Sequence, residues 1–244
     1  MRSGNPSLRE NTFDDYRGWS QGNTMTIQGT VNKTFILLLL VVLSAVYTWY
    51  QYFSGVDVTA YLLIGAIGGF IVSLIATFWK QSTPITAPVY ALLEGLFVGG
   101  ISALYEAQFQ GITTLAVTLT FAVLFSLLII YKLRIIKVTQ NFRLGLFAAT
   151  FGILLTYLIN IILSFFGVSV PFLHDSGPIG ILISLFIVVI AALNLVLDFD
   201  FIEKGAQMNC PKYLEWYGAF GLMVTLVWLY LEILRLLSKV MSRK

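Results

Sequence analysis

Five acidic residues lie inside long apolar stretches of this sequence, where a charged group is costly to keep. They are Glu94, Asp198, Asp200, Glu215 and Glu232. A charge at the centre of a bilayer costs about 3 kcal/mol on insertion scales. Membrane spans retain such groups mainly where they line ion pathways, relay protons or pair with another charge. The sequence therefore predicts that the chain works through buried carboxylates.

The spacing of these acids predicts which of them meet. Asn194 and Asp198 share a helix face, whereas Asp200 points nearly the opposite way. If the connecting turn centres near residue 207, Asp198 and Glu215 lie at similar depth in an antiparallel hairpin. Two close carboxylates share a proton and respond to pH, and ionised carboxylates are ligands for Ca²⁺. We expect Asp198 and Glu215 to form a proton sensor and a Ca²⁺ site, although they could instead cap loop backbone.

The other acids have different expected roles. Glu94 lies about ten residues into its apolar stretch, so we expect it near the middle of the membrane, within the ion pathway. Asp200 belongs to the same pathway or simply ends its helix in the headgroup region. Asn194 and Glu232 are further candidates for the ion pathway. Glu232 precedes Arg235 by three residues, so the two can instead pair on one helix face while Arg235 reaches toward water.

The elements that must position these acids are transmembrane helices. Hydrophobic residues make up 58% of the 244 residues and charged residues only 11%, too few to cover a soluble surface. Seven stretches reach the length of about 20 residues that a spanning helix needs. They are Thr34–Phe53, Val58–Trp79, Ile85–Tyr105, Ile112–Tyr131, Leu144–Phe166, Ile179–Phe201 and Tyr213–Leu237. We expect an all-α integral membrane bundle of seven transmembrane helices over residues 29–244, preceded by a polar, disordered arm, residues 1–28.

Basic residues indicate the orientation. Eleven Lys and Arg residues fall on the side of the N-terminus and none in the three loops opposite, which places the N-terminus in the cytoplasm. Four more, between Arg235 and Lys244, follow the last stretch and would lie outside after seven crossings. Two alternatives remain: the last stretch re-enters without crossing, or an earlier stretch fails to cross.

Helix packing is also marked in the sequence. The last stretch repeats polar and small residues at three- and four-residue spacing from Glu215 through Gly218 and Thr225, which predicts a central helix. Small residues four apart let helix backbones approach closely in lipid. Such pairs are Gly65 and Gly69, Gly95 and Gly99, and Gly145 and Ala149.

Several classes of function are disfavoured. The single histidine, His174, lies in a loop, and the zinc-protease pattern H-E-x-x-H is missing, as are nucleotide-binding glycine loops. We therefore expect no enzyme activity and no bound cofactor. The basic residues lie in loops and termini, which suits a membrane surface and does not indicate nucleic acid.

Three motifs resemble those of a known family. They are A-P-V-Y-A-L-L-E-G from Ala87, L-N-L-V-L-D-F-D-F-I-E from Leu193, and P-K-Y-L-E-W-Y from Pro211, which continues into T-L-V-W-L-Y-L-E from Thr225. Together they resemble the bacterial, YccA-like branch of the Bax inhibitor family (transmembrane Bax inhibitor motif). The resemblance runs from about residue 25 to the end of the chain.

This resemblance implies a seven-helix bundle with a central last helix, in the bacterial inner membrane. It also implies a pH-gated leak of Ca²⁺, sensed by two aspartates on the sixth and seventh helices. Asp198 matches the first, but the seventh helix has no aspartate; Glu215 fits by depth, Glu232 by its local pattern, and we prefer Glu215. The alternative function is a non-catalytic regulator that binds a membrane protease or stress and cell-death machinery through the N-terminal arm.

Overall fold

Seven long helices make up most of the computed structural model, which describes residues 24–167 and 175–243. Each is long and apolar enough to cross a membrane. A short 3-10 helix, η1 (Lys80–Ser82), precedes α4. The long helices are α2 (Ile27–Phe53), α3 (Thr59–Phe78), α4 (Thr83–Gln108), α5 (Ile112–Lys132), α6 (Gln140–Ser164), α7 (Pro178–Gln207) and α8 (Leu214–Met241). The prediction of an all-α, seven-helix membrane bundle is confirmed. His174 and residues 1–23 of the N-terminal arm lie outside the described residues.

Several helices extend beyond the apolar stretches because capping residues, and not hydropathy, determine where they begin. Helix α2 starts at Ile27, seven residues before Thr34, since the hydroxyl of Thr26 accepts a hydrogen bond from the N–H of Gly29. Helix α7 continues past Phe201 to Gln207. Hydropathy reports only the part of a helix that faces lipid, so polar ends are missed.

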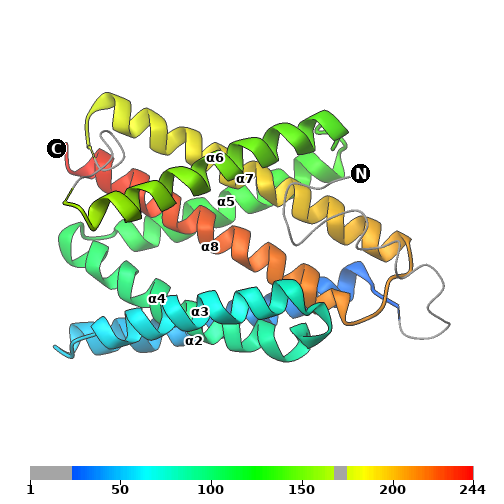
Figure 1. Ribbon diagram of the computed structural model, residues 1–244, viewed down its shortest axis with the longest axis horizontal. Helices are drawn as coiled ribbons and strands as arrows, with labels where there is room; N and C mark the ends of the chain where they lie inside the picture. Colours follow the sequence, from blue (N-terminus) through cyan, green and yellow to red (C-terminus); the bar gives the residue numbers. More distant parts are fainter. Residues whose placement is uncertain (1–23, 168–174, 244) are drawn as a thin grey trace.

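Helix α8 is the central element of the bundle. It contacts α2, α4, α5 and α7, and a larger share of it is buried than of any other span. Figure 1 shows it running diagonally between the group formed by α2, α3 and α4 and the group formed by α5, α6 and α7. The predicted central position of the last helix is confirmed.

Glycines bring α2, α3 and α4 into backbone contact. A Cβ atom at Gly99 would lie 2.3 Å from the carbonyl oxygen of Ala45, and one at Gly95 would lie 2.5 Å from that of Val41. A Cβ at Gly65 would likewise lie 2.6 Å from the carbonyl oxygen of Leu93. The expected close packing of small residues therefore holds for these helices, as membrane helices without a hydrophobic driving force require.

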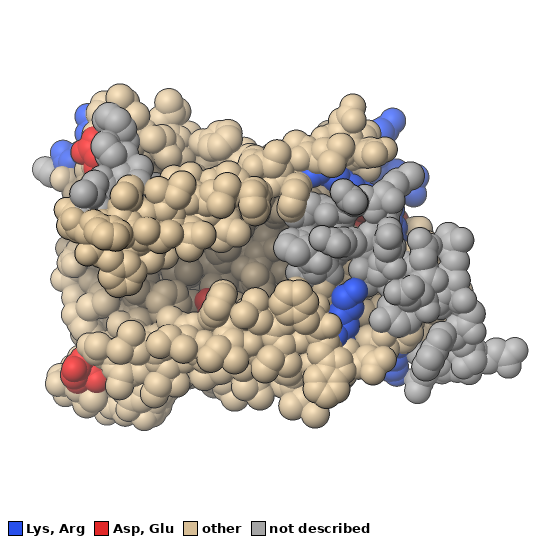
Figure 2. All heavy atoms as spheres, in the orientation of Figure 1, with Lys and Arg blue, Asp and Glu red and all other residues tan. Residues whose placement is uncertain are grey.

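The ends of the described chain lie apart. Helix α8 is one continuous helix, and its end lies at the opposite end of the bundle from the start of α2 (Figure 1), as seven crossings require. On the face seen in Figure 2, charged side chains gather at the two ends of the molecule, and the surface between them is uncharged except for acidic atoms inside a hollow. This distribution is the one expected of a chain whose middle faces lipid.

Candidate functional site

Asp198 is enclosed where α7 packs against α8. Its side chain is 3% exposed and faces Gly221, where a Cβ atom would lie 3.9 Å from Oδ1. Thr225, one turn further along α8, interacts with the same carboxyl group. The other oxygen, Oδ2, has no hydrogen-bond partner among the described residues. Buried polar atoms are nearly always paired, so an unpaired carboxylate oxygen in a span marks a candidate functional site.

Asn194 lies one turn before Asp198 but interacts with a different helix. Its Nδ2 donates to the hydroxyl of Thr150 on α6 at 2.9 Å and to the carbonyl of Ile190 at 2.8 Å. Asn194 therefore fastens α7 to α6, while Asp198 faces α8.

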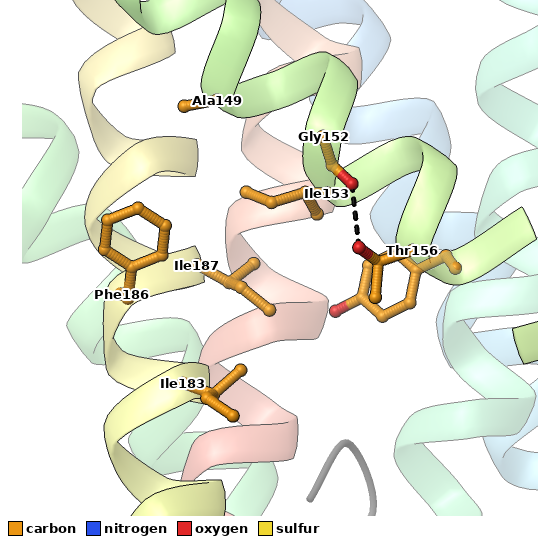
Figure 3. A pocket seen from close by; sticks show the side chains of 8 residues that line it. Ala149, Gly152, Ile153, Thr156, Ile183, Phe186 and Ile187 are labelled. Carbon is orange, nitrogen blue, oxygen red and sulfur yellow. Dashed lines mark hydrogen bonds between the residues drawn. The ribbon is translucent and has the colours of Figure 1, made fainter. Parts of the chain in front are cut away.

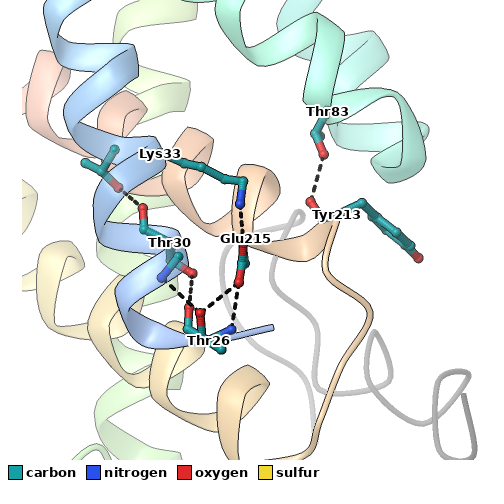
Figure 4. Close-up of polar contacts among 8 residues, drawn as sticks. Thr26, Thr30, Lys33, Thr83, Tyr213 and Glu215 are labelled. Atoms are coloured by element: carbon teal, nitrogen blue, oxygen red, sulfur yellow. Dashed lines mark hydrogen bonds and ion pairs between the residues drawn. The ribbon is translucent and has the colours of Figure 1, made fainter. Parts of the chain in front are cut away.

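Glu215 does not meet Asp198, which corrects the expected pair. The carboxylate of Glu215 is 1% exposed; it accepts hydrogen bonds at Oε1 from the N–H and hydroxyl of Thr26, each at 2.9 Å, and pairs at Oε2 with Lys33 (Figure 4). Asp198 lies level with Gly221, six residues later on α8, which is about 9 Å along the helix axis.

The expectation was wrong because the hairpin turn lies later than assumed. Helix α7 ends at Gln207 and α8 begins at Leu214, so the connection centres on Cys210 and Pro211. Glu215 therefore lies at the start of α8, while Asp198 lies more than two turns before the end of α7. The two cannot share a proton or jointly bind one Ca²⁺ in this arrangement. Within the described ranges, no group of three or more His, Cys, Asp or Glu residues is placed to hold a metal.

Asp200 has two basic partners. Its Oδ2 lies 2.6 Å from Nη2 of Arg143 on α6 and 3.0 Å from Nζ of Lys204. It does not end its helix, because α7 continues for two more turns. Arg143 was counted with a basic loop in the sequence, but it is the fourth residue of α6 and only 8% exposed.

Glu232 forms the expected pair with Arg235, and this prediction is confirmed. Glu232 is 2% exposed, and both of its carboxylate oxygens lie 3.2 Å from Nη1 of Arg235. Two further donors were missed in the sequence: the hydroxyl of Tyr157 on α6 at 2.8 Å and the indole N–H of Trp228 at 3.2 Å. No sequence spacing points to Tyr157, which lies 75 residues away.

A groove beside the Glu232–Arg235 pair lies between α6 and α7 (Figure 3). Its volume is about 340 Å³ and its walls are mainly apolar. The lining residues are Ala149, Gly152, Ile153, Thr156, Tyr157, Ile183, Phe186 and Ile187. Thr156 directs its hydroxyl at the carbonyl of Gly152, so the groove offers few free polar groups.

Glu94 is partly exposed on α4 and stands apart from the other acids. Tyr90, one turn earlier, interacts with its carboxyl group. A Cβ atom at Gly69 of α3 would lie 3.3 Å from Oε2 of Glu94. Glu94 thus lies at the contact between α3 and α4, and the structure does not join it to Asp198 in one cluster.

The whole arrangement can be compared with known proteins. No curated protein and no solved structure matches the chain. A family model described as Bax inhibitor 1 like matches residues 5–242, which is nearly the entire sequence. The seven-helix bundle, its central last helix and this match agree, and the chain belongs to the Bax inhibitor 1 like family of multi-pass membrane proteins.

Proposed function

We propose that this chain is a pH-sensitive leak channel for Ca²⁺ in the bacterial inner membrane, with a cytoplasmic N-terminus and Asp198 as its proton-sensing group. One observation carries the proposal: Oδ2 of Asp198 is enclosed and has no hydrogen-bond partner among the described residues. Asp200, Glu215 and Glu232 each pair with a basic side chain. Asp198 forms no such pair with a basic side chain of the described residues, so a change in its charge is not offset by an ion-pair partner there.

The residues around Asp198 interact differently with its protonated and its ionised form. An ionised carboxylate only accepts hydrogen bonds, whereas a protonated one also donates. The hydroxyl of Thr225 donates to the carbonyl of Gly221 at 3.2 Å, so its oxygen can accept a hydrogen bond from the protonated carboxyl group of Asp198. The ionised form instead attracts a cation strongly in this low-dielectric interior. Protonation would thus change the forces between α7 and α8, and a proton-gated opening needs two such states.

The separate positions of Asp198 and Glu94 favour passage of a Ca²⁺ ion over tight binding of it. Tight Ca²⁺ sites supply six to eight oxygen ligands. Asp198 on α7 and Glu94 on α4 instead offer one carboxylate at a time. Conduction requires binding that is weak enough for the ion to leave. Isolated carboxylates are therefore more compatible with a leak than with a Ca²⁺ buffer.

The test is Ca²⁺ entry into dye-loaded liposomes that hold the purified protein, measured between pH 6 and pH 8. We expect flux that varies with pH in the wild type and loses that dependence in Asp198→Asn. The control is Asp57→Asn, which makes the same chemical change at an exposed position between α2 and α3. Flux no greater than in empty liposomes at every pH would overturn the channel proposal. An unchanged pH profile in Asp198→Asn would overturn the assignment of the sensor.

The alternative, a non-catalytic regulator that captures a membrane protease or stress and cell-death machinery, stays a prediction. Its proposed handle is the N-terminal arm, and residues 1–23 lie outside the described residues. Membership of the YccA-like branch also stays a prediction.

A further inference from the structure

The beginning of α8 is bound to the segment Thr24–Lys33, which enters and forms the first turns of α2. Glu215 accepts two hydrogen bonds from Thr26 and pairs with Lys33, whose side chain is 15% exposed (Figure 4). Charge-assisted hydrogen bonds of this enclosed kind are about twice as strong as neutral ones. The contact joins residues 182 positions apart, so it ties the start of α2 to the start of α8 near one end of the bundle.

Backbone contacts reinforce this attachment. The N–H of Met25 donates to the carbonyl of Cys210 at 2.6 Å, and Thr24 forms an isolated antiparallel bridge with Pro211. Met25 is 2% exposed. A Cβ atom at Gly29 would lie 2.2 Å from Oε1 of Glu215, so the segment fits the carboxylate only because that position is glycine.

The same segment reaches the surroundings of Asp198 through Gly218. A Cβ atom at Gly218 would lie 3.2 Å from Ile202 of α7, 3.3 Å from Thr30 of α2 and 3.5 Å from Met25. Helices α2, α7 and α8 therefore meet at this glycine. It lies one turn before Gly221, which faces Asp198, and Ile202 lies one turn after Asp198.

We propose that Thr24–Lys33 is a latch on α8. When the Lys33–Glu215 pair is formed, the latch is closed and holds the first turns of α8 against α7. When the pair breaks, the latch opens, and α8 can shift at Gly218 and Gly221. This shift alters the surroundings of Asp198. The proposal rests on the proposed function only in taking Asp198 as the sensing group. Coupling between two sites is reciprocal, so a change at Asp198 must shift the opening of the latch by the same factor.

Cys210 provides a native probe of latch opening. It is the only cysteine of the chain, it is 1% exposed, and its own carbonyl holds Met25. Burial also raises the pKa of its thiol to about 11. Maleimide labelling of the full-length protein in liposomes, at one fixed pH, therefore measures how often this region opens.

Removing the ion pair should speed this labelling. We expect Lys33→Met to react with maleimide about tenfold faster than the wild type, as loss of a charge-assisted hydrogen bond implies. Thr26→Val should change the rate in the same direction and replaces Lys33→Met if that variant does not fold. The matched control is Gln28→Ala, because Gln28 lies in the same segment, is exposed, and its side chain donates to Asn32 and not to α8 among the described residues. A wild-type rate in Lys33→Met and Thr26→Val, or an equal increase in Gln28→Ala, would overturn the latch.

The link to Asp198 has its own measurement. We expect Asp198→Asn to change the labelling rate of Cys210 by about fivefold or more, the usual range of coupling between sites. A wild-type rate in Asp198→Asn would overturn the coupling. Neither result depends on ion flux. If the liposomes show no flux, the leak proposal is overturned and the latch proposal is not affected. If they show flux but the labelling rates of the variants equal that of the wild type, the latch proposal is overturned and the leak proposal is not affected.

Discussion

Asp198 and Asp200 are two residues apart on α7 and turn to different helices: Asp198 faces Gly221 of α8, and Asp200 pairs with Arg143 of α6. Glu203, one turn after Asp200, accepts a hydrogen bond from the hydroxyl of Tyr131 on α5. Three successive acids therefore link α7 to three different neighbours. Of these three, Asp198 has a fully buried oxygen, Oδ2, without a hydrogen-bond partner among the described residues.

The contact between Asp198 and Gly221 predicts a size limit at that glycine. Gly221→Ala should keep the fold and the pH profile of flux, because its methyl group would lie at an ordinary contact distance of 3.9 Å from Oδ1. Gly221→Leu should push α7 and α8 apart and cost about 1–3 kcal/mol, as overpacking usually does. Thermal unfolding in detergent compares the two; equal stability would show that the site is looser than the structure has it.

The two ion pairs of Asp200, with Arg143 and with Lys204, should contribute unequally to stability. Arg143→Leu should cost about 3 kcal/mol, because the side chains of Arg143 and Asp200 are only 10% and 15% exposed. Lys204→Leu should cost less than about 1 kcal/mol, since Lys204 is 36% exposed. Unfolding free energies of the two variants in the same detergent give the comparison. A larger loss in Lys204→Leu would contradict this ranking.

Tyr157 should act both through its hydroxyl and through its ring. Tyr157→Phe removes the donor to Glu232 and should cost about 1 kcal/mol, since Arg235 still pairs with Glu232. Tyr157→Ala also removes the ring, whose centre lies 4.9 Å from the guanidinium of Arg235, and should cost about 3 kcal/mol. Thermal unfolding again separates them, and equal losses would assign the whole effect to the hydroxyl.

Gly99 and Gly145 should respond differently to the same substitution, because Gly99 is tightly packed and Gly145 faces open space. Gly99→Ala should destabilise the bundle by more than about 1 kcal/mol, because its Cβ would collide with the backbone of Ala45. Gly145→Ala should be neutral or stabilise α6 by about 0.5 kcal/mol, because nothing lies within 4 Å of its Cβ and alanine favours the helix. Destabilisation by Gly145→Ala would indicate a contact with another chain in the membrane.

The raised pKa of the Cys210 thiol predicts how stability varies at high pH. Burial raises this pKa from 9.0 to about 11, so the folded state holds its proton where the unfolded state has lost it. The contribution is complete below pH 9 and decreases as the pH rises toward about 11. Cys210→Ser should reduce this alkaline loss in unfolding measurements between those pH values. If the loss of stability at high pH is the same in Cys210→Ser as in the wild type, it arises from other groups.

The number and type of the helices could be predicted from the sequence, because the length and apolarity of a span are local properties. The pair Glu232–Arg235 could be predicted for the same reason, since both residues lie on one helix face. Glu215 could not be assigned to Lys33, because that contact depends on how α2 packs against α8. The end of α7 was also placed too early. Helix α7 continues for six further residues, Ile202 to Gln207, so the residues of α7 and α8 that lie at the same depth differ from those expected.

Glycine pairs show the same limit. Gly95 and Gly99 meet the backbone of α2, whereas the equivalent spacing at Gly145 and Ala149 leaves Gly145 with open space. The two patterns share the four-residue spacing of small residues, and the position of α6 at the edge of the bundle distinguishes their surroundings.

The described part of the chain holds seven spans, an odd number, which gives each molecule a direction. Because α2 begins at one end of the bundle and α8 finishes at the other, a tag inserted just before α2 and a tag inserted just after α8 would be accessible from opposite sides of a vesicle. A protease added to sealed vesicles would then remove one tag from molecules inserted one way and the other tag from the rest. Reconstituted samples can in this way be sorted by insertion direction, and inward and outward ion movement can be assigned to separate populations.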